Sequence, residues 1–94
     1  MIYVDTPREY GREPAGYRGR LRARIRWGHL IADTDAEAHV IAQRLGLRRE
    51  WWQGDHYDLV PTKRLAAIRF GAVALDRRAF VAKSKELRAR RTAG

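Results

Sequence analysis

The residues best suited to chemistry in this chain form two histidine–aspartate groups, His56-Tyr57-Asp58 and His29 with Asp33. Histidine transfers protons near neutral pH, and carboxylates bind divalent metal ions or orient a neighbouring histidine. Sites that process phosphoesters combine these groups. We therefore identify His56, Asp58, His29 and Asp33 as candidate catalytic residues. A structural alternative stays open, because a hydrogen-bonded loop anchor also explains the triplet and helix capping also explains Asp33.

The candidate metal ligands are three carboxylates, Asp5, Asp33 and Asp58. Oxygen ligands favour hard ions, so the expected cofactor is Mg²⁺ or Mn²⁺ if the site binds a metal. The chain has no cysteine and no residue spacing typical of a zinc or calcium motif. The sequence therefore leaves the cofactor open.

Arginines at alternate positions make the segment from Arg18 to Arg26 the most basic part of the chain. Alternate side chains share one face of a β-strand, so we expect a strand here with its arginines in solvent. Guanidinium groups bind phosphate oxygens through paired hydrogen bonds. The candidate ligand-binding residues are four of these arginines and three residues in or after the triplet: Arg20, Arg22, Arg24, Arg26, Tyr57, Lys63 and Arg64. A solvated basic face without a ligand is the alternative.

The composition indicates one small folded domain over residues 1–94, because 45% of the residues are hydrophobic. The net charge of +9, from 20 basic and 11 acidic residues, favours an anionic partner. No apolar run has the length of a membrane span, and the N-terminus lacks the basic and apolar regions of a signal peptide. We expect a cytoplasmic protein that does not bind membranes.

Cap residues and apolar spacing predict three helices. Thr34 with Glu37 matches a capping box, Gly46 suits a helix C-cap, Pro61 suits a helix start, and Asp76 suits an N-cap. The expected helices span residues 35–45, 61–70 and 77–90, with a frayed basic tail at 88–94. Further strands are expected at residues 2–4, 30–32, 47–53 and 72–75, and loops at 6–19 and 54–58. This alternation predicts a small α/β domain with a mixed, mostly parallel sheet.

The predicted topology also predicts where the candidate site lies. The carboxyl ends of parallel strands meet at one edge of a sheet, and ligands bind in the crevice outside them. The triplet His56-Tyr57-Asp58 should then lie beside His29 and Asp33. The same concave site should expose Lys63 or Arg64, near the start of the second helix.

Short motifs run through the first 75 residues: Tyr3-Val4-Asp5, Trp27-Gly28-His29-Leu30, Ala32-Asp33, Leu45-Gly46-Leu47, Trp51-Trp52, His56-Tyr57-Asp58, Lys63-Arg64 and Gly71-Ala72. Through these motifs the chain resembles a family of small bacterial and phage proteins that is classed as a domain of unknown function. The resemblance implies that the polar positions form one family feature, and it implies no activity. One position departs from expectation: Val60 stands where a Ser or Thr cap would precede Pro61.

Three functions are compatible with these residues. The first is a basic protein that binds an anionic, phosphate-containing ligand, either a nucleotide or a nucleic acid. The second is a hydrolase or transferase that acts on a phosphoester, with His56 as acid and base. The third is a phage or host interaction protein that binds an acidic protein surface. Convergence of the histidines and aspartates in one pocket would favour a small ligand or an enzyme, whereas a continuous arginine band would favour nucleic acid.

Overall fold

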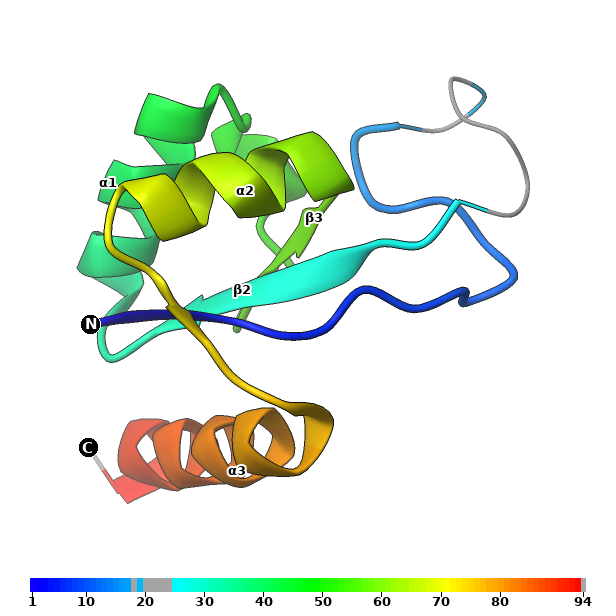
Figure 1. Ribbon diagram of the computed structural model, residues 1–94. Coiled ribbons are helices and arrows are strands. Elements are labelled where there is room, and N and C mark those ends of the chain that lie inside the picture. The colour runs from blue at the N-terminus through cyan, green and yellow to red at the C-terminus, as the bar shows by residue number, and fades with distance from the viewer. Residues whose placement is uncertain (18, 20–24, 94) are drawn as a thin grey trace.

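A four-stranded sheet lies between helices on both of its faces (Figure 1). The computed structural model describes residues 1–17, 19 and 25–93. The strands are β1 (Ile2–Val4), β2 (Gly28–Ala32), β3 (Tyr57–Leu59) and β4 (Val73–Ala74), in the order β3-β2-β1-β4. Helices α1 (Asp35–Leu45) and α2 (Pro61–Arg69) cover one face, and α3 (Arg77–Ala93) covers the other. A 3₁₀ helix, η1 (Arg49–Trp51), follows α1.

Each face of the sheet has its own apolar core because side chains alternate along the strands. Val4, Leu30 and Leu59 pack against α1 and α2. Tyr3 and Ile31 point the other way and pack against α3 through two of its buried residues, Phe80 and Leu87. The candidate site lies on this second face, where polar side chains continue the alternation along the strands.

The predicted small α/β fold with a mixed sheet and three helices is confirmed, but its expected excess of parallel strand pairs is wrong. Only β1 and β4 pair in parallel, whereas β1–β2 and β2–β3 are antiparallel. A parallel crossover through α1 would have required the next strand to start soon after that helix. The chain instead passes through η1 and a turn, and enters β3 from the opposite end of the sheet.

The segment between α1 and α2 is the main error in the predicted elements. The strand expected at residues 47–53 contains η1, and part of the loop expected at residues 54–58 is β3. Leu47 is buried, but Trp51 and Trp52 are only half-buried against the edge of the core, so this segment has no alternating buried face. The alternation of apolar and polar residues typical of a strand lies in β3 itself. It is short, and its polar middle residue, Asp58, makes it hard to recognise in the sequence.

The bounds of α1 match the prediction because local cap chemistry sets them. The N–H of Glu37 donates to Thr34 Oγ1 at 3.2 Å, as a capping box requires. Gly46 ends the helix with φ at 77°, the left-handed region that glycine adopts at low cost. The N–H of Leu47 then donates to the carbonyl oxygen of Ala42 at 2.8 Å and closes the last turn. At α2, Val60 is the N-cap residue and its side chain makes no cap hydrogen bond.

Replacing the N-cap residue of α3 should destabilise the protein. Asp76 Oδ1 accepts a hydrogen bond from the N–H of Ala79 at 2.8 Å. Asp76→Ala removes this acceptor and should lower the free energy of unfolding by about 1 kcal/mol, whereas Asp76→Ser should retain most of it. Urea unfolding followed by circular dichroism measures both variants. Equal stabilities for the alanine and serine variants would contradict the assignment of Asp76 as a cap.

The basic tail, for which fraying is predicted, is helical as far as Ala93. Arg88 Nε lies 3.2 Å from Asp55 Oδ2, and Arg91 pairs with Asp35. These two contacts and the burial of Leu87 hold the last turns of α3 against the sheet and α1. None of the helices in the described ranges is long and apolar enough to cross a membrane.

Most of the arginine stripe lies outside the described residues. Arg18, Arg20, Arg22 and Arg24 are among the residues that the structure does not describe. Arg26 is exposed and precedes β2, which begins at Gly28. The strand expected through this segment therefore remains a prediction.

Candidate functional site

A row of polar residues crosses three neighbouring strands on the face that α3 covers. Asp5 directly follows β1, and its N–H donates to the carbonyl oxygen of His29 on β2. His29 is in turn the cross-strand partner of Asp58 on β3. His56 precedes β3, two residues before Asp58 and thus on the same face, and its ring centroid lies 5.1 Å from that of His29. Antiparallel register thus brings together residues that are far apart in sequence.

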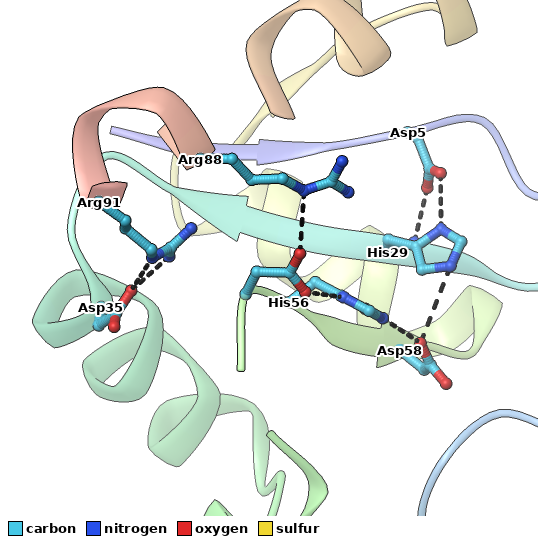
Figure 2. Close-up of polar contacts among 8 residues, drawn as sticks. Asp5, His29, Asp35, His56, Asp58, Arg88 and Arg91 are labelled. Carbon is cyan, nitrogen blue, oxygen red and sulfur yellow. Dashed lines mark hydrogen bonds and ion pairs between the residues drawn. The ribbon is translucent and has the colours of Figure 1, made fainter. Parts of the chain in front are cut away.

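Asp5 fixes the orientation of His29 through two contacts. Asp5 Oδ1 accepts the backbone N–H of His29 at 2.6 Å, and Asp5 Oδ2 lies 2.8 Å from His29 Nδ1 (Figure 2). A carboxylate accepts hydrogen bonds, so Nδ1 is the protonated nitrogen of the neutral ring. The Nε2 atom of His29 then carries the lone pair and points toward Asp58.

A second carboxylate orients His56 in the same way. His56 Nδ1 lies 2.6 Å from Asp55 Oδ1, and the other Asp55 oxygen accepts from Arg88. Burial lowers the pKa of His56, but Asp58 and Asp55 raise it by more, so the net shift is upward. Burial raises the pKa of Asp55, but His56 and Arg88 outweigh burial and hold it below its usual value. The Nε2 atom of His56 faces Asp58 Oδ1 at 3.3 Å.

Asp58 is the most buried group of the site, with a residue exposure of 3%. Its Oδ2 atom accepts the backbone N–H of Ala15 at 2.8 Å. Its Oδ1 atom accepts no hydrogen bond from the described residues, although both imidazole Nε2 atoms face it. Burial raises the pKa of Asp58, but His56 and the Ala15 N–H lower it by more, so this carboxyl stays ionised.

A pocket of about 280 Å³ opens beside these residues, between the sheet and α3. Asp5, His29 and His56 line it from the sheet. Five basic side chains surround it against two acidic ones, Asp5 and Asp55; the basic ones are Arg8, Arg77, Lys85, Arg88 and Arg91. Apolar atoms of Ile31 and Phe80 complete the wall. The pocket is therefore positively charged and partly apolar.

Four of the predicted site residues meet here. His29, His56, Asp58 and Asp5 share the α3 face, and they are four of the five histidines and aspartates expected to converge. Arg64 reaches the group from α2, where its Nε atom donates to the backbone carbonyl oxygen of Asp5 at 2.7 Å. Arg64 therefore supports the site through the backbone of Asp5.

Three predicted residues lie elsewhere. Asp33 lies at the other end of β2, where it accepts from the Tyr3 hydroxyl at 2.9 Å and the Met1 amino group at 3.0 Å. The Met1 amino group is the main cause that lowers the pKa of Asp33. Asp33 was expected in the site because a parallel sheet would align the carboxyl ends of the strands. In the antiparallel β1–β2 pair, the end of β1 lies beside the start of β2, which holds His29.

Tyr57 and Lys63 belong to the opposite face of the sheet. Strand alternation turns Tyr57 away from its neighbours in the triplet, and its hydroxyl lies 2.8 Å from His39 Nδ1. The Lys63 ammonium group lies close to Gly46, at the end of α1. Neither residue lines the pocket between the sheet and α3.

Asp55 and the cations of α3 were not among the predicted site residues. Asp55 directly precedes His56, and this adjacency was a usable signal for a histidine-orienting carboxylate. Four basic residues share one face of α3 at helical spacing: Arg77, Lys85, Arg88 and Arg91. This helical spacing is visible in the sequence. It was not used because residues 88–94 were expected to fray.

Comparison with known proteins gives one match. No curated protein and no solved structure matches the chain. A family described as "Protein of unknown function (DUF4031)" matches residues 2–87. The match includes the four described strands, the histidines and aspartates of the site and α3 as far as Leu87, so it extends beyond the 75 residues that carried the resemblance. The chain belongs to this family, the proteins of unknown function DUF4031.

Proposed function

We propose that the protein binds a small anionic, phosphate-containing ligand of the nucleotide class in the pocket between the sheet and α3. The observation that carries this proposal is the ring of five basic side chains around a pocket with two imidazoles in its wall. A volume of about 280 Å³ is close to the lower end of small-molecule sites, about 300 Å³. This size favours a mononucleotide or a smaller phosphate ester over an extended nucleic acid.

The cations of α3 are suited to bind a phosphate group. Arg77 and Lys85 form no ion pair with any residue in the described part of the chain. Arg88 uses its Nε atom for Asp55, which leaves its terminal nitrogens for a ligand. Charge-assisted hydrogen bonds from such groups are stronger than neutral ones. The apolar wall at Ile31 and Phe80 would contact the organic part of the ligand.

An enzyme that processes the bound phosphoester is the second candidate. It is favoured by one observation: His29 and His56 both line the pocket, and a carboxylate orients each of them. Oriented imidazoles are typical acid–base groups, and they are also typical metal ligands. Neither proposal uses the predicted arginine stripe, because Arg20, Arg22 and Arg24 lie outside the described residues and Arg26 does not line the pocket.

Removal of two pocket cations should weaken nucleotide binding. We expect Arg77→Ala/Lys85→Ala to raise the dissociation constant of nucleoside monophosphates at least about tenfold, because each lost charged hydrogen bond contributes about 1.5–3 kcal/mol. The matched control is Arg69→Ala/Arg78→Ala, which removes the same charge from exposed residues outside the pocket. Isothermal titration calorimetry at fixed salt, with inorganic phosphate as a second probe, measures both variants.

The control decides between a site and simple charge attraction. If both double variants lose the same affinity, net charge explains the binding and the pocket proposal is wrong. Absence of binding by every nucleoside monophosphate tested would also refute it. If the protein hydrolyses a chromogenic phosphoester and His56→Gln abolishes this activity, the result would support the second candidate, an enzyme.

A further inference from the structure

Three potential metal-ligand atoms converge beside the pocket between the sheet and α3. The Nε2 atoms of His29 and His56 lie 3.8 and 3.3 Å from Asp58 Oδ1 (Figure 2). All three atoms lie within 4.8 Å of one another. When either ring is neutral, the carboxylate at Nδ1 places the proton on that nitrogen, so that Nε2 presents a lone pair. Three electron-rich atoms thus face a common point, and their mutual repulsion favours a cation there.

We propose that His29 Nε2, His56 Nε2 and Asp58 Oδ1 bind one divalent transition-metal ion of the zinc class. A tetrahedral ion with ligands at about 2.0–2.2 Å separates its ligands by about 3.3–3.6 Å. The two distances to Asp58 Oδ1 are already close to that separation. Imidazole nitrogens favour Zn²⁺ and Co²⁺ over Mg²⁺. The donor set therefore argues against the Mg²⁺ or Mn²⁺ expected from the carboxylates alone.

The surroundings of the three atoms match those of metal sites. Metal-binding histidines donate their second N–H to a carboxylate or a carbonyl group, and Asp5 and Asp55 take that place here. Asp58 Oδ2 is held by the Ala15 N–H, so only Oδ1 is free and it would bind in monodentate form. Asp58 is also more than nine-tenths buried, and a buried carboxylate oxygen with no donor needs a partner.

The fourth position of such an ion would face the pocket, because both histidines line it. A metal with three protein ligands and one open position is the arrangement of catalytic zinc sites. Water or a phosphate oxygen would complete the coordination. The inference stands without the proposed ligand, because it rests only on the three donor atoms and the carboxylates that orient the rings.

Metal binding is testable without any organic ligand. After chelator treatment and dialysis, the full chain is titrated with Zn²⁺ in competition with a chromophoric chelator, and with Co²⁺ by visible absorption. We expect one ion per chain and the intense visible bands of four-coordinate Co²⁺. His56→Gln and Asp58→Asn should each weaken binding at least about 100-fold, and Asp55→Asn about 10–100-fold, because it leaves the ligands but releases the His56 ring.

The matched control is His39→Gln, because His39 lies on the opposite face beside Tyr57 and outside the cluster. It should bind Zn²⁺ and Co²⁺ as the parent chain does. Asp58→Asn changes a buried group, so circular dichroism must confirm its fold, and His56→Gln decides the question if it does not fold. Unchanged binding in His56→Gln, or a parent chain that binds neither ion, would overturn the proposal and leave a protonated histidine as the cation. Neither outcome alters the nucleotide titrations.

Discussion

Trp27→Ala is expected to lower the free energy of unfolding by about 3–5 kcal/mol, the range for removal of a buried tryptophan or phenylalanine. Trp27 has an exposure of 0%. Its indole N–H donates to the carbonyl oxygen of Arg12 at 2.9 Å, and the Tyr10 ring lies 4.5 Å from its own. Two backbone hydrogen bonds join Trp27 to Arg8. The side chain and the backbone of Trp27 together hold the segment of residues 8–12 against the start of β2.

This loss would be a large fraction of total stability, because small domains are stable by only about 5–15 kcal/mol. The segment that Trp27 holds leads to Ala15, whose N–H binds Asp58. The damage should therefore extend to the candidate site. Trp27→Phe fills most of the volume and loses the indole N–H, so we expect a smaller destabilisation of about 1–2 kcal/mol.

Urea unfolding followed by far-ultraviolet circular dichroism measures these variants without relying on tryptophan fluorescence. Leu65→Ala is a suitable control because Leu65 is an apolar residue with 53% exposure, and its replacement should cost less than about 0.5 kcal/mol. A cost below 1 kcal/mol for Trp27→Ala, similar to that of Leu65→Ala, would contradict the anchoring role of Trp27.

Elements set by local chemistry were predictable from the sequence. The capping box at Thr34 and the left-handed Gly46 delimit α1, and Asp76 caps α3 where expected. These signals act within a few residues of the chain, so one sequence contains them in full. Strand direction has no such local signal. It depends on how the chain returns after α1, and the turn at η1 that reverses it contains no glycine or proline to mark it in the sequence.

The candidate site was predicted in part, for a reason that proved wrong. His29, His56 and Asp58 were expected together because parallel strands align their carboxyl ends. They meet because β2 and β3 are antiparallel and place His29 opposite Asp58. The same difference in direction excludes Asp33, which would have joined them in a parallel sheet.

Gly28→Ala should impair the site as well as the fold. Gly28 is buried on β2, and a Cβ atom there would overlap Asp5 Oδ1, the atom that accepts the N–H of His29. Its φ angle is not positive, so alanine suits the backbone and would normally stabilise a strand by about 0.5–1 kcal/mol. The overlap with Asp5 should make the substitution destabilising instead. We expect a destabilisation of about 1–3 kcal/mol and a loss of metal affinity of about 10–100-fold.

A double-mutant cycle with Asp5→Ala tests whether this overlap is the cause. If the carboxylate of Asp5 is the obstacle, Gly28→Ala should become neutral or stabilising once Asp5 is alanine, with an interaction energy of about 1–3 kcal/mol. Urea unfolding of the four proteins gives this energy, and Co²⁺ titration reports on His29 in each. If Gly28→Ala lowers the free energy of unfolding equally with Asp5 and with alanine at position 5, the close approach of Asp5 does not require glycine. The predicted coupling would instead explain why glycine lies between Trp27 and His29: it leaves room for the carboxylate that orients the histidine.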